Sequence, residues 1–129
     1  MYRIALEKLS ECSKSYPAEL LQALQRIVGK DAGHIYMVGG TVRDCLLGRV
    51  SHDLDLAVSG RALNSAKQLQ RELGGGTLID LSGPEDEAFR LVWQGEQIDF
   101  STFRAGAQSI EEDLRLRDFT INAMAVQLP

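Results

Sequence analysis

The sequence predicts an α/β (α+β) fold in which a mixed sheet is flanked by two or more helices. Two segments carry apolar residues at the three- and four-residue spacing of amphipathic helices. Other short runs are apolar throughout, or alternate polar and apolar side chains as β-strands do. The 129 residues are enough for a single domain, because domains most often contain about 100–150 residues.

The first predicted element is a helix at residues 18–29, which Pro17 precedes. Its leucine, isoleucine and valine side chains repeat at helical spacing. We assign this helix to an N-terminal helical segment, residues 1–30. The apolar run Ile35–Val38 follows, and it predicts a short buried strand.

A glycine pair, Gly39 and Gly40, ends this strand and predicts a turn. The next residues predict a brief helix that begins near Thr41 and ends at Gly48. Residues 53–60 then alternate polar and apolar side chains, which predicts a second strand.

Residues 61–73 predict another amphipathic helix, which a run of three glycines ends. Further strands are predicted at residues 77–81, 89–93 and 98–103. We expect the last two strands to form a hairpin through a two-residue Gly-Glu loop in a type II′ turn. The final segment, residues 109–126, opens with Ser109 as a helix N-cap and with acidic residues in its first turn.

Composition excludes several classes of protein. The formal net charge of −4 excludes a uniformly basic nucleic-acid-binding protein, so any contact with nucleic acid is expected to be local. No apolar run is long enough for a membrane span or a signal peptide, so no membrane partner is expected. Cys12 and Cys45 are too few for a disulfide framework, which predicts a cytoplasmic location. Cys45 lies in the short predicted helix beside Leu46 and Leu47, which predicts a buried, inert thiol.

A pair of carboxylates lies on the predicted 53–60 strand. Because side chains alternate along a strand, Asp53 and Asp55 share one face while Leu54 and Leu56 face the core. The two carboxylates repel each other unless a cation bridges them. Mg²⁺ prefers such hard oxygen ligands, and a pair of ions assists phosphoryl transfer. The alternative is a solvated edge strand.

A third carboxylate, Asp99, shares a strand face with Ser101. If its strand lies beside that of Asp53 and Asp55, three acidic side chains converge. The sequence leaves that adjacency open.

The glycine pair predicts a phosphate site. Glycine lets the backbone approach a ligand closely, and the following helix N-terminus directs N–H groups toward it. Arg43 lies in the first turn of that helix, where it can bind triphosphate oxygens. The alternative is a tight turn in which Arg43 pairs with Asp44 or Asp53.

Polar residues also accompany the apolar part of residues 115–125. Arg117 and Asp118 stand beside Phe119, where charges need a partner or a ligand. Asn122 can hydrogen-bond a ribose hydroxyl. The alternative is an ion pair that caps the end of a helix.

The motifs VGGTVRDCLLG, HDLDLAV, IDFSTFR and EEDLRLRDFTINAMA, in this order, resemble the head domain of class II CCA-adding enzymes and bacterial poly(A) polymerases. The resemblance covers residues 35–126. It implies a nucleotidyltransferase fold of the polymerase-beta type, a small mixed sheet flanked by helices, with the catalytic core at 35–126. It also implies that the neck, body and tail domains of the family are absent from this chain.

The resemblance further implies a role for each motif. The residues that it implies bind two catalytic Mg²⁺ ions are Asp53, Asp55 and Asp99. The residues that it implies bind the nucleotide are Gly39, Gly40, Arg43, Asp44, Arg104, Arg117, Asp118 and Asn122. The implied substrates are ATP and CTP, and the implied partner is an RNA 3′ end, with tRNA as the expected acceptor.

Departures from the family pattern bear on the product. Leu116 stands where relatives carry the first of two arginines. Residues 105–109 form a short connection, which is typical of members that stop after two cytidines, whereas members that complete CCA often have a longer loop. CCA, CC and A addition therefore all stay open.

The leading prediction is a domain that transfers CMP or AMP from an NTP to an RNA 3′-hydroxyl. The alternatives are a poly(A) polymerase head domain, a nucleotide-binding module without catalysis, and a stand-alone transferase that modifies a small molecule or protein. The presence of all three acids favours an enzyme over an inactive module.

Overall fold

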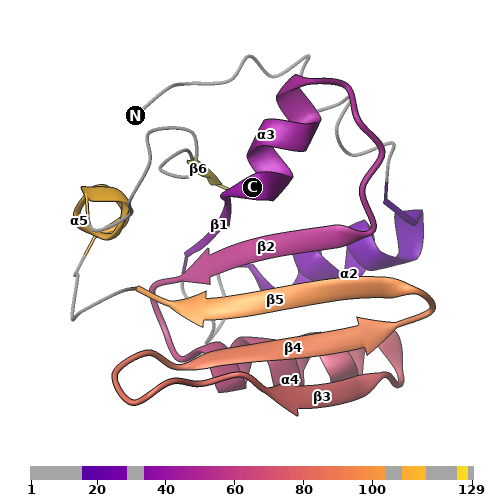
Figure 1. Ribbon diagram of the computed structural model, residues 1–129. Coiled ribbons are helices and arrows are strands. Elements are labelled where there is room, and N and C mark those ends of the chain that lie inside the picture. Colours follow the sequence, from indigo (N-terminus) through magenta and orange to yellow (C-terminus); the bar gives the residue numbers. More distant parts are fainter. Residues whose placement is uncertain (1–15, 29–33, 104–108, 116–124, 128–129) are drawn as a thin grey trace.

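A computed structural model describes residues 16–28, 34–103, 109–115 and 125–127 of the chain (Figure 1). Its strands are β1 (Ile35–Val38), β2 (Asp53–Val58), β3 (Thr77–Asp80), β4 (Ala88–Trp93), β5 (Glu96–Thr102) and β6 (Ala125–Gln127). Its helices are α2 (Ala18–Ile27), α3 (Gly40–Leu46), α4 (Ala62–Leu73) and α5 (Ile110–Arg115). The predicted mixed α/β fold is confirmed. Among the described residues, no helix has the length and apolar character that crossing a membrane requires.

The strands form one six-stranded sheet in the order β3-β4-β5-β2-β1-β6. β2 and β5 are parallel, and every other neighbouring pair in this sheet is antiparallel. The chain passes from β2 to β5 through α4 and the β3–β4 pair, which is the crossover that a parallel pair requires. This crossover places β2 and β5 side by side at the centre of the sheet (Figure 1).

Helices α2 and α4 pack against one face of the sheet and enclose the main core (Figure 1). Leu54 and Leu56 of β2 and Phe100 of β5 are buried there, each 2% exposed or less. Because side chains alternate, the residues between them, such as Asp55 and Asp99, lie on the opposite face. That face carries the candidate site.

A smaller apolar cluster lies on the same face as the acids. Val38, Ala57, Phe103 and Ile110 are buried in it, and Tyr36 packs against them. Ile110 is the first residue of α5, so this cluster holds α5 against one end of the open face. Ser109 accepts a hydrogen bond from the Glu112 N–H at 3.2 Å, and the predicted N-cap is therefore confirmed.

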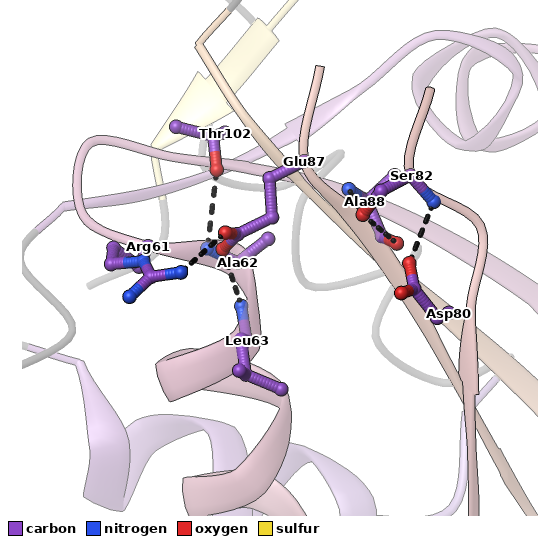
Figure 2. A network of polar contacts seen from close by, with 8 residues as sticks. All are labelled: Arg61, Ala62, Leu63, Asp80, Ser82, Glu87, Ala88 and Thr102. Atoms are coloured by element: carbon purple, nitrogen blue, oxygen red, sulfur yellow. Dashed lines mark hydrogen bonds and ion pairs between the residues drawn. The ribbon is translucent and has the colours of Figure 1, made fainter. Parts of the chain in front are cut away.

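A polar network fixes the start of α4 (Figure 2). The Glu87 carboxylate accepts hydrogen bonds from the Leu63 N–H at 3.0 Å and from Arg61 Nη2 at 2.9 Å. Thr102 Oγ1 accepts the Ala62 N–H at 3.2 Å. These contacts satisfy N–H groups that have no partner within the helix, and they join α4 to the end of β5.

The hairpin between β4 and β5 differs from the prediction. Trp93 and Glu96 are paired, so the loop consists of Gln94 and Gly95 rather than a Gly-Glu pair. Gln94 and Gly95 have φ values of 47° and 80°. Two positive φ values define a type I′ turn, and the predicted type II′ turn is wrong. Glycine at the second loop position favours type I′, because this position also requires a positive φ.

The prediction of an inert thiol at Cys45 is also wrong, because Cys45 of α3 is disulfide-bonded. The other cysteine of the sequence, Cys12, lies outside the described residues. Pairing requires the two Cα atoms to come within about 7 Å, which depends on the tertiary structure and leaves no sign in sequence spacing.

Candidate active site

The two acids of β2 lie beside the third acid on β5. The parallel register pairs Asp55 directly with Asp99, and Asp53 with Gln97. Asp53 and Asp55 share a face because they are two residues apart on one strand. The adjacency that the sequence left open is therefore present, and it brings the three predicted carboxylates to one region of the open face.

The glycine turn adjoins the acids. A Cβ atom at Gly39 would lie 3.8 Å from Asp55 Oδ2, and one at Gly40 would lie 3.9 Å from the same atom. Gly39 has a φ of +62°, a conformation that favours glycine. The backbone of the turn between β1 and α3 thus lies close to the Asp55 carboxylate.

Thr41, a residue that sequence reasoning did not select for the site, connects this turn to the acidic strand. The β1–β2 pairing ends at Met37 and Leu56, because the chain turns away at Gly39. Beyond that point, Thr41 Oγ1 accepts the Asp55 N–H at 2.7 Å and donates to the Asp53 carbonyl oxygen at 3.4 Å. The hydroxyl thereby takes the place of the missing strand partner.

Two more hydroxyls hold the start of β2, and sequence reasoning missed both. The Tyr16 hydroxyl donates to the Asp53 carbonyl oxygen at 2.9 Å. Ser51 Oγ donates to the same oxygen at 3.1 Å and accepts the Asp53 N–H at 3.1 Å. Burial raises the pKa of Tyr16 to about 12, so its hydroxyl stays protonated and able to donate into the alkaline range.

Arg43 folds back over the glycine turn. A Cβ atom at Gly40 would lie 3.2 Å from Arg43 Nη2. Arg43 Nε also donates to Asp44 Oδ1 at 3.3 Å, so the ion pair that the sequence offered as the structural alternative is present. This pair uses one N–H of a guanidinium that carries five. Arg43 can therefore still bind an anion at the turn.

Arg90 of β4 binds Asp99 through both carboxylate oxygens. Nε lies 2.8 Å from Oδ1, and Nη2 lies 3.0 Å from Oδ2. The antiparallel register places the two residues directly opposite each other. The hydrogen bond from Arg90 to Asp99 raises the pKa of Arg90, and the negative charge of Asp99 raises it further. The negative charges of Asp53 and Asp55 contribute in the same direction. The site's negative potential thus reaches the guanidinium.

The donor set fits Mg²⁺ in its chemistry, because all three predicted ligands are carboxylates. Among the described residues, however, no three or more His, Cys, Asp or Glu side chains are arranged so that they could together hold a metal ion. Asp53 and Asp55 share a strand face, and Asp99 is engaged by Arg90. The register brings the predicted ligands to neighbouring positions, and the third of them, Asp99, already has a cationic partner.

Part of the predicted nucleotide site lies outside the described residues. This applies to Arg104, Arg117, Asp118 and Asn122, and to Leu116. Their predicted roles stay predictions.

Sequence and structure comparisons extend these findings. Residues 35–129 match the family described as the poly A polymerase head domain. The CCA-adding enzyme of Streptococcus suis (strain 05ZYH33) is 36% identical over 118 residues, which cover 84% of this chain and 28% of that protein. The A-adding tRNA nucleotidyltransferase of Aquifex aeolicus (strain VF5) is 39% identical over 106 residues, which cover 72% of this chain and 12% of that protein. A solved complex of a CCA-adding enzyme with ATP is similar at a TM-score of 0.76 and 34% identity, covering 98% of this chain and 30% of that one. The chain thus spans less than a third of the length of each of these proteins.

Proposed function

Because this chain belongs to the poly A polymerase head-domain family, we propose that it is the nucleotidyltransferase domain of an enzyme that extends RNA 3′ ends. It transfers CMP from CTP, AMP from ATP, or both, and tRNA is the acceptor. The observation that carries the proposal is the pairing of Asp55 with Asp99 next to the Gly39–Gly40 turn. The names of the relatives favour a tRNA acceptor over poly(A) synthesis. We further propose residues 35–126 as the catalytic core.

In the proposed reaction, the acceptor 3′-hydroxyl loses its proton to water and its oxygen forms a bond to the α-phosphorus of the NTP. The bond between that phosphorus and the oxygen bridging to the β-phosphate breaks, and pyrophosphate leaves. Asp53, Asp55 and Asp99 would hold Mg²⁺, which when bound stabilises negative charge on the reacting phosphoryl oxygens. Arg43 binds triphosphate oxygens, and the glycine turn lets the backbone approach them. Thr41 keeps the turn and the Asp55 backbone in fixed register. Such positioning supplies much of the rate in phosphoryl transfer.

CCA, CC and A addition remain alternative outcomes of this proposal, since the relatives include both CCA-adding and A-adding enzymes. The cytoplasmic location stays a prediction. The disulfide of Cys45 does not favour it, because disulfides are more typical of oxidising compartments.

Binding of ATP to the 129-residue chain, measured by calorimetry with and without Mg²⁺, tests the proposal. The wild-type chain is expected to bind ATP in an Mg²⁺-dependent manner, and the double variant Asp53→Ala with Asp55→Ala is expected to lose that dependence. Glu85→Ala with Asp86→Ala removes the same charge from two exposed residues and serves as the matched control. Unchanged Mg²⁺ dependence in the Asp53 and Asp55 double variant would refute the metal assignment.

A further inference from the structure

We propose that the positive charge of Arg90, which is held against Asp99, lowers the affinity of the carboxylate site for divalent cations until the NTP binds. This inference rests on the proposed function, because it assumes that the three carboxylates bind metal. It concerns a residue on a neighbouring strand that is not itself a metal ligand.

The first support is the geometry of the contact. Arg90 and Asp99 occupy directly opposed positions on β4 and β5, and both oxygens of the carboxylate accept a hydrogen bond. A bidentate contact fixes the plane of the carboxylate as well as its position. The side chains are 33% and 32% exposed, so the pair is shielded from water on most of its surface.

The second support is a row of charges across the sheet. The register aligns Arg90, Asp99 and Asp55 on three adjacent strands, and Asp53 lies on the same face as Asp55. Arg90 therefore offsets one of the three negative charges that would attract a cation. Its positive charge repels a divalent ion that approaches Asp99.

Arg90 need not leave for the metal to bind. A carboxylate has about four lone-pair positions, and the guanidinium uses two of those on Asp99. Asp99 can thus accept a metal ion while Arg90 keeps it oriented. An NTP brings its own negative charges to the site, and these outweigh the single charge of Arg90, so the inference predicts tight metal binding only with the NTP present.

Mn²⁺ titration of the 129-residue chain without NTP, followed by electron paramagnetic resonance, tests this inference. Loss of the positive charge in Arg90→Gln is expected to tighten Mn²⁺ binding by a factor on the order of ten. Arg90→Lys keeps the charge and is expected to stay within about twofold of the wild type. Arg71→Met removes an exposed arginine of α4 and is expected to have no effect.

Arg90→Met provides a second charge-removing variant, and circular dichroism establishes which variants are folded. If Arg90 acted only by orienting Asp99, substitution would weaken Mn²⁺ binding, which is the opposite of the change expected from loss of its charge. Unchanged or weaker Mn²⁺ binding in the folded Gln or Met variant overturns the inference and leaves the proposed function intact. Failure of the wild-type chain to bind Mn²⁺ even with ATP present overturns both.

Discussion

Thr41 Oγ1 accepts a hydrogen bond from the Asp55 N–H at 2.7 Å, where the strand β1 no longer pairs with β2. One side chain therefore links the glycine turn, where the NTP phosphates are proposed to bind, to the strand that carries two of the proposed metal ligands. The position of Asp55 relative to Gly39 depends on this link.

Thr41→Val keeps the shape of this side chain and removes its hydroxyl. Thr41 is only 3% exposed, so the Asp55 N–H is left without its partner. We expect the free energy of unfolding to fall by about 1–3 kcal/mol, and ATP binding to weaken, whereas Thr41→Ser retains both. Urea denaturation and calorimetry measure the two effects. Equal stability of the Val and Ser variants would show that the hydroxyl contact contributes nothing.

The raised pKa of Tyr16 predicts that the protein loses stability at alkaline pH. The folded protein raises the pKa of Tyr16 from 10.0 to about 12, chiefly through burial. A raised pKa means that its contribution to stability is fully present below pH 10 and is lost as the pH rises through about 12. We expect Tyr16→Phe to reduce the stability difference between pH 9 and pH 11, measured by urea denaturation. An identical alkaline loss in this variant would contradict the prediction.

The environment of Glu87 predicts a loss of stability at acidic pH, the opposite end of the pH range from Tyr16. The Leu63 N–H lowers the pKa of this carboxyl most strongly, and Arg61 contributes further (Figure 2). A lowered pKa means that the contribution to stability is present above the ordinary value of 4.5 and is lost as the pH falls through the folded value. Glu87→Gln is expected to destabilise the protein by about 1 kcal/mol at pH 7.

The same substitution is expected to have a smaller effect at pH 3, where the wild-type carboxyl is increasingly protonated. Glu85→Gln, at a nearby exposed position, is the control and should leave stability unchanged at both pH values. A cost of Glu87→Gln that does not depend on pH would indicate lost packing rather than lost charge.

Local patterns predicted most elements and the shared face of Asp53 and Asp55, because strand and helix periodicity depends only on neighbours along the chain. The predicted hairpin turn is wrong because turn type depends on which residues pair, here Trp93 with Glu96. A one-residue change in pairing converts one turn into another.

The contacts of the site could not be predicted in the same way. Arg90 meets Asp99 only through the register of β4 and β5. Tyr16 reaches Asp53 across the fold from the start of the described chain, and no local pattern marks that contact. Alternation along β4 places Arg90 on the polar face, so the available signal was a charged residue on a strand beside an acidic one.

Substitution of Arg43 is expected to affect binding of the triphosphate more than binding of the nucleoside. Its guanidinium lies over Gly40 at the turn, so it is expected to contact the triphosphate and not the nucleoside. A hydrogen bond to a charged group contributes about 1.5–3 kcal/mol, so Arg43→Ala is expected to weaken ATP binding by at least about tenfold and adenosine binding by less than about twofold. Arg49→Ala removes an exposed arginine that follows the same helix and is the matched control. Calorimetry with ATP and with adenosine measures both affinities. Equal losses for the two ligands would mean that Arg43 supports the fold of the turn, and the phosphate assignment would then have to move to another residue.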